Sequence, residues 1–162
     1  MSSIENPDRR LLRHAVATLA YRGARAARGA PPEFASFRAA ASTRTPAEIL
    51  AHVGDLLDWA LSLCRGQEVW KDSPPLPWKD GVARFHEGLS RLDAALAAAG
   101  PLGCPVEKLF QGPIADALTH VGQISMLRRM AGAPVRGENF FRADIAAGRV
   151  GSDQATPRRE FD

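Results

Sequence analysis

The chain has 162 residues, a formal net charge of +3, 45% hydrophobic residues and 24% charged residues. This length is enough for one domain with a substantial core and too short for two, and the composition is typical of an ordered protein. The arginines that share one side of the first predicted helix, Arg10, Arg25 and Arg28, have no aromatic residue among them. We interpret them as a solvated helix face and expect no nucleic-acid partner.

The beginning of the chain, MSSIENPDRR, is polar and lacks the apolar segment of a secretory signal. No run approaches the ~18 consecutive apolar residues that a membrane helix needs. Cys64 and Cys104 do not have the spacing of a zinc site. We therefore expect a cytoplasmic protein with reduced thiols and no membrane contact.

Two helix beginnings can be read directly from the sequence. Asn6 followed by Pro7 is typical of a helix N-cap and first position, and the first helix is expected to end before Gly29. Phe34 and Phe37, three residues apart, indicate a short helical turn that presses both rings onto the core. The segment 45–48, TPAE, is a capping box that predicts the start of the second helix, which Gly66 ends.

Two further amphipathic segments follow. The prolines in 73–77 separate the second helix from a third, over 82–99, where His86 is expected to meet Asp93 or solvent. The last helix is predicted over 113–132, with Pro113 at its first position and Gly132 at its C-cap.

These segments predict an all-α fold, a four-helix bundle without strands. Residues 1–148 are expected to form a single domain and residues 149–162 a loosely ordered C-terminal tail. The apolar positions at helical spacing predict a core that includes Leu12, Val16, Leu19, Val53, Leu56, Phe85, Leu89, Leu92, Leu118, Val121 and Ile124.

The last helix carries an unusual polar pair, Asp116 and His120, at its apolar face. Residues four apart on a helix lie over one another, so the carboxylate and the imidazole can approach one point. One interpretation is a core histidine whose ring nitrogen is satisfied by the aspartate. The other is a pair of metal ligands.

A second histidine, His52, lies on the flank of the second helix beside Trp59, with Asp55 further out. Burying His52, Asp116 and His120 without partners would cost several kcal/mol, so they must satisfy one another, meet water or bind a cation. Three protein ligands with open positions are typical of a catalytic metal site. The donor set suits Zn, Ni, Fe or Mn without selecting among them.

The segments AHVGDLLDWAL around His52 and THVGQISMLRRMAG around His120 resemble the DinB-like (YfiT-like) superfamily of damage-inducible helical bundles. The resemblance extends from the first helix to about Gly132. It implies a divalent metal held by a histidine of the second helix and a His-x-x-x-His pair of the last one. His52 and His120 match two of these ligands, Asp116 stands where the family has histidine, and Gln123 matches a glutamine common in the family.

The resemblance also implies a function, since the superfamily includes thiol-dependent transferases and a maleylpyruvate isomerase, many of them homodimers. We expect a metal-dependent transferase of a low-molecular-weight thiol to a small electrophile, with Gln123, Asp55 and Trp59 around the ligands. The alternative is a non-enzymatic dimeric stress-response or binding bundle with a structural or vestigial metal site. A homodimer could cover Trp59 and the Phe140–Phe141 pair, or the C-terminal tail could cover them within one chain. The segment 135–149 is expected to close the pocket.

Overall fold

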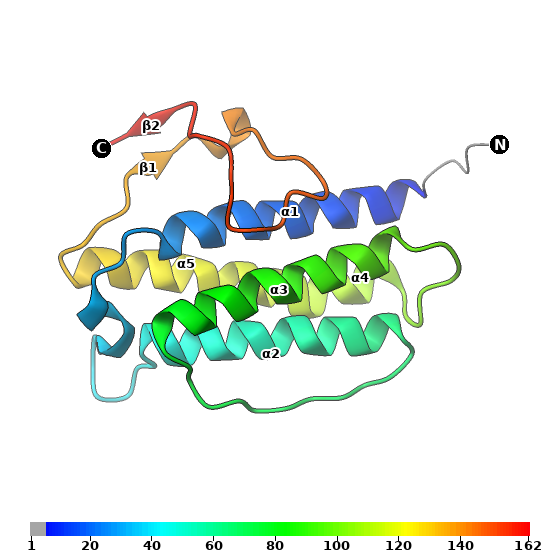
Figure 1. The fold of residues 1–162 in the computed structure, drawn as a ribbon, viewed down its shortest axis with the longest axis horizontal. Helices are drawn as coiled ribbons and strands as arrows, with labels where there is room; N and C mark the ends of the chain where they lie inside the picture. Colours follow the sequence, from blue (N-terminus) through cyan, green and yellow to red (C-terminus); the bar gives the residue numbers. More distant parts are fainter. Residues whose placement is uncertain (1–5) are drawn as a thin grey trace.

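The computed structural model describes residues 6–162, which are mostly helical (Figure 1). The long helices are α1 (Pro7–Ala27), α2 (Pro46–Cys64), α3 (Trp78–Ala97) and α5 (Ala115–Met130). The shorter elements are η1 (Pro32–Ser36), α4 (Val106–Leu109), η2 (Phe110–Ile114), β1 (Gly137–Glu138), η3 (Phe140–Arg142) and β2 (Glu160–Phe161). No helix in this described range is long and apolar enough to cross a membrane.

The predicted beginnings of the first two helices are confirmed, and the third helix begins at Trp78, four residues before the predicted start. The Asn6 side chain accepts hydrogen bonds from the backbone N–H groups of Asp8 and Arg9, at 2.9 and 3.2 Å. At the start of α2, the Thr45 hydroxyl accepts from the Glu48 N–H while the Glu48 carboxylate accepts from the Thr45 N–H. These reciprocal bonds satisfy two backbone donors that a helix end leaves free, so α2 begins at a fixed residue.

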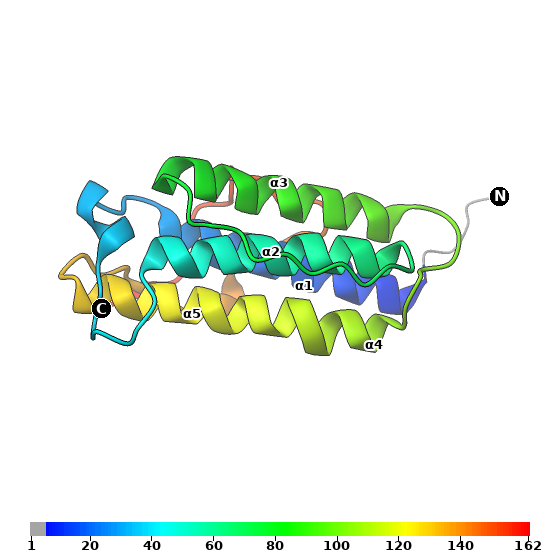
Figure 2. The same cartoon turned by 90° about the horizontal axis from the view of Figure 1, so that it is seen from below.

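The long helices pack around one apolar core. α1 and α2 each lie against both α3 and α5, and the views in Figures 1 and 2 show all four running side by side. Every predicted core residue is buried except Leu118, which is half-buried. Phe34 of η1 is also buried, and Phe37 packs on the core beside it, as the spacing of the two rings predicted.

The start of the last helix differs from the prediction. Pro113 does not open that helix but lies inside the π-helical turn η2, so helical backbone runs from α4 through η2 into α5. Proline has no N–H to donate and its ring clashes with the preceding α-helical turn. The wider π turn accommodates one extra residue, and the helix continues past the proline instead of starting there.

The connection between α2 and α3 runs back along the length of α2 (Figures 1 and 2). Its middle is anchored by the Ser73 N–H, which donates to the Asp55 carboxylate at 2.9 Å. The other Asp55 oxygen accepts from Arg84 of α3 at 2.8 Å. One buried carboxylate therefore holds both this connection and the neighbouring helix on α2.

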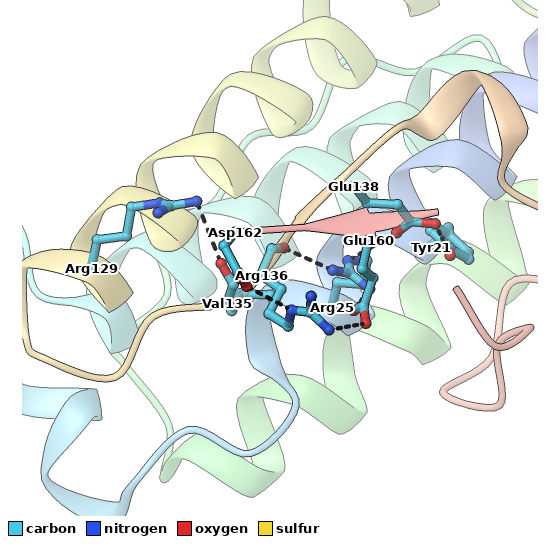
Figure 3. A network of polar contacts seen from close by, with 8 residues as sticks. All are labelled: Tyr21, Arg25, Arg129, Val135, Arg136, Glu138, Glu160 and Asp162. Atoms are coloured by element: carbon cyan, nitrogen blue, oxygen red, sulfur yellow. Dashed lines mark hydrogen bonds and ion pairs between the residues drawn. The ribbon is translucent and has the colours of Figure 1, made fainter. Parts of the chain in front are cut away.

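The C-terminal segment is docked on the helices, where the sequence predicted a loosely ordered tail. β2 pairs antiparallel with β1, and Val150 is buried in the core. The Tyr21 hydroxyl donates to Glu138 at 2.7 Å, and Arg25 forms ion pairs with Glu138 and Glu160 (Figure 3). Arg25 is thus not part of a solvated face, because the buried Glu138 and the more exposed Glu160 both pair with its guanidinium.

Candidate metal centre

His52, Asp116 and His120 come together between α2 and α5. The Asp116 Oδ2 atom lies 3.6 Å from His52 Nε2, and Asp116 Oδ1 lies 3.4 Å from His120 Nε2. The two imidazole rings meet edge to face with centroids 4.7 Å apart. One possible ligand atom from each residue lies within 4.8 Å of the other two, so the three residues could hold a metal ion.

The two nitrogen–oxygen distances distinguish between a hydrogen-bonded pair and a shared cation. Both exceed the ~2.7–3.2 Å range of N–H···O hydrogen bonds. Metal–nitrogen and metal–oxygen bonds of about 2.1 Å place two tetrahedral ligands about 3.4 Å apart. The separations of 3.4 and 3.6 Å, each to a different oxygen of Asp116, are close to this value, and the three residues are near enough to one another to share a cation.

Gln123 fixes the orientation of the His120 ring. Its Oε1 atom lies 2.8 Å from His120 Nδ1, which makes Nδ1–H the donor. The lone pair of Nε2 is then directed toward Asp116. A ligand histidine commonly donates its other ring N–H to an oxygen in this way, which sets the tautomer and raises its basicity. This contact places Gln123 directly beside His120.

The surroundings of His52 favour the neutral imidazole that a metal requires. Partial burial lowers the pKa of His52, and the charges of His120 and Arg44 lower it further, whereas the Asp116 carboxylate raises it. The net direction is downward from 6.5. At neutral pH the ring is therefore uncharged and can donate a lone pair.

Asp55 borders a hollow together with His52, and Trp59 borders one together with Asp116, but their polar and ring contacts are made with other residues. Asp55 binds Arg84 and the backbone of Ser73, which makes it an anchor for the α2–α3 connection. The Trp59 ring instead packs edge to face on Trp70 of that connection, with centroids 5.9 Å apart. Trp70 in turn meets the His52 ring edge to face with centroids 5.6 Å apart, so the connection that Asp55 and Trp59 contact lies against His52.

The centre is reachable from solvent on several sides. The side chains of His52, Asp116 and His120 are 21%, 46% and 14% exposed. A hollow of about 880 Å³ is bordered by His120, one of about 390 Å³ by His52, and another of about 390 Å³ by Asp116. A cation held by these three residues would keep positions open to an exchangeable ligand.

The chain was compared with known protein families, with curated proteins and with solved structures. None of these comparisons found a match.

The tail does not close this site. Phe140 packs edge to face on Tyr21 and lies beneath the Arg22 guanidinium, and Glu138 is held by Arg25, so this part of the segment 135–149 packs on α1. None of its residues borders the three hollows at the centre. The expectation of a closing tail is wrong, because the aromatic and acidic residues find partners on α1.

Two residues that border the centre were not predicted from the sequence. Trp70 lies in a long connection where no periodic pattern marks it, and only its ring contact with His52 reveals its position. Arg44 directly precedes the N-cap residue Thr45 and borders the hollows beside His52 and His120. The sequence gives one signal for Arg44, which is its position just before the capped helix that carries His52.

Proposed function

We propose that this chain is a DinB-like four-helix bundle that binds one divalent metal through His52, Asp116 and His120. The observation that carries the proposal is the convergence of two imidazole nitrogens and one carboxylate at separations suited to a shared cation. The motif resemblance supports the same three residues, with Asp116 in place of a histidine. Zn, Ni, Fe and Mn all accept this mixed donor set.

The further proposal is transfer of a low-molecular-weight thiol to a small electrophile. A bound divalent cation would lower the pKa of a thiol ligand and so favour the nucleophilic thiolate. Asp116 supplies one negative charge, which leaves a net positive centre for an anionic fourth ligand. In the overall reaction the thiol sulfur bonds to the electrophilic carbon, and the thiol proton leaves with the displaced group.

The chain's own residues would prepare the site for that reaction. Gln123 accepts the Nδ1–H bond of His120 and so keeps Nε2 directed inward. Trp70 covers one edge of His52 and limits water there. Neither cysteine takes part, because burial raises the pKa of the Cys64 thiol to about 11 and also raises the pKa of Cys104.

Metal analysis of the untagged full chain tests the binding proposal. We expect one equivalent of a divalent metal after loading with Zn, Ni, Fe or Mn and desalting. His52→Ala and His120→Ala are expected to lose at least about tenfold in affinity, since each removes a direct ligand. His14→Ala is the matched control, because His14 is exposed on α1. Equal metal content in the wild type and His120→Ala would contradict the site.

An activity assay tests the transfer proposal separately. The metal-loaded chain is incubated with several cellular thiols and a chromogenic aryl halide, beside His52→Ala and His14→Ala. We expect thiol consumption in the wild type and His14→Ala, and background rates in His52→Ala. The contrary outcome is a wild type that binds stoichiometric metal and consumes no thiol faster than His52→Ala, whichever thiol and metal are used. That result would favour a non-enzymatic bundle with a structural metal.

A further inference from the structure

A long apolar groove leads away from the candidate metal centre. This α2–α5 groove, the hollow of about 880 Å³, lies between residues 39–49 and residues 119–130. Its floor and walls include Ile49, Leu127, Met126 and Met130, and the two methionines are 60% and 55% exposed. Exposed, flexible methionines are well suited to an apolar ligand, because the unbranched thioether adapts to its shape.

One end of the α2–α5 groove opens on the candidate ligands. His120 and Gln123, which are hydrogen-bonded to each other, both border it. A molecule lying in the groove would therefore extend along α5 with one end beside the candidate centre.

Among residues 6–162, Arg44 is the one lining residue of the α2–α5 groove that is formally charged at neutral pH. Arg44 also borders the neighbouring hollow that contains His52, so the two hollows share this residue. Within residues 6–162, the Arg44 side chain forms no ion pair and donates no hydrogen bond. Arg38 nearby differs in this respect, because Glu48 and the Thr43 carbonyl occupy its guanidinium.

An apolar groove with one unpaired cation selects a particular kind of ligand. An apolar surface favours burial of a hydrocarbon or aromatic body. A free guanidinium offers paired N–H donors in the geometry of a carboxylate. No acidic side chain from the described part of the chain lines the groove, so none there would repel such a group.

We propose that the α2–α5 groove binds a small molecule with an apolar body and one carboxylate, and that Arg44 holds the carboxylate. This assignment extends the proposed function, in which such a molecule is the electrophilic substrate. Arg44 is then a residue that determines specificity, since neutral molecules of the same shape lack its charge-assisted bonds. The apolar contact with Met126 and Met130 is shared by charged and neutral ligands.

A matched pair of probes tests this binding site without any metal or thiol chemistry. 2-Naphthoate and 2-naphthalenemethanol have the same ring system and differ in charge. Both are titrated calorimetrically into the full chain in the presence of EDTA. We expect the carboxylate to bind at least about tenfold more tightly than the alcohol, because a charge-assisted hydrogen bond contributes that much to the free energy of binding.

The variants separate the role of Arg44 from general surface charge. Arg44→Gln is expected to weaken naphthoate binding about tenfold and to leave the alcohol unchanged, and Arg44→Lys should restore part of the loss. Arg10→Gln removes a charge from an exposed position on α1 and should bind both probes like the wild type. Met130→Gln should weaken both probes.

Three outcomes would overturn the assignment. They are equal affinity for the two probes, an equal loss in Arg44→Gln and Arg10→Gln, and no binding of naphthoate at all. His52→Ala should bind naphthoate as the wild type does in EDTA. The experiments can therefore reject ligand binding in the groove while metal binding is retained. They can equally reject metal binding while ligand binding in the groove is retained.

Discussion

Two histidines of this chain use their Nδ1 atoms for different purposes. In His120 the Nδ1–H group is held by a side chain three residues along α5, which leaves the other nitrogen free to bind a ligand. In the buried His86, Nδ1 donates to the Val150 carbonyl at 3.0 Å and ties the C-terminal segment to α3. The sequence predicted a contact between His86 and Asp93 or solvent, but Asp93 binds Arg13 instead.

We predict that His86 makes the free energy of unfolding depend on pH. Burial lowers the pKa of His86 below 6.5, whereas its bond to the Val150 carbonyl opposes this shift without cancelling it. As the pH falls from 7 to 5, the unfolded chain binds a proton that the folded chain resists. Stability should therefore decrease over this range, and His52 adds to the decrease because its pKa is also lowered.

Urea unfolding of the wild type and His86→Gln at pH 7, 6 and 5 checks this prediction. The variant should start less stable and lose less stability with acidification, since glutamine does not titrate. His14→Gln on the exposed side of α1 should follow the wild-type curve. Parallel curves for His86→Gln and the wild type would show that the buried imidazole is not the cause.

At the scale of the elements, the closeness of α1 to α3 depends on one glycine. A Cβ atom at Gly23 would lie 2.4 Å from Cζ of Phe85, a ring that is 2% exposed. Gly23→Ala is expected to lower the free energy of unfolding by about 1–3 kcal/mol, because the core ring has no space to move. Denaturant titration at one pH measures this change.

Gly122 of α5 provides the matched control. Apart from its chain neighbours and the backbone of its own helix, no atom of residues 6–162 lies within 4 Å of a Cβ atom placed at this position. Gly122→Ala should therefore raise the free energy of unfolding by about 0.5–1 kcal/mol, since alanine reduces the entropy lost when a helix forms. If the two substitutions gave equal effects, helix propensity rather than the α1–α3 contact would dominate.

At the scale of the whole molecule, the remaining exposed rings lead us to predict a homodimer. Trp59 and Phe140 are partly covered within the chain by Trp70 and Tyr21, but Phe141 is 97% exposed. A symmetric partner could cover it. Light scattering at micromolar concentration should return twice the chain mass of 17.5 kDa.

Substitution of Phe141 provides the comparison for that measurement. Phe141→Ser should shift the mass toward the monomer, while Leu76→Ser, at a position 39% exposed in the α2–α3 connection, should not. A monomer mass for the wild type across the micromolar range would remove the dimer and leave Phe141 as an isolated apolar side chain.

The sequence by itself determined the features that depend on neighbours along the chain. Apolar periodicity and the caps at Asn6 and Thr45 predicted the first two helix beginnings correctly, because a cap is a contact between residues two or three apart. The same local geometry brought Asp116 and His120 to one face of α5. Pro113 was the exception, since a π turn depends on how the whole helix packs.

Only the tertiary structure decided which segments meet across the molecule. The 3.6 Å approach of His52 to Asp116 follows from the packing of α2 on α5, which no spacing along the chain specifies. Likewise, the Asp55 contact with Ser73 holds the connection that carries Trp70 near His52, and Arg25 holds Glu138 on α1, away from the site. These choices depend on burial and charge pairing between distant residues, so the folded molecule alone fixes what covers the candidate centre and what leaves it open.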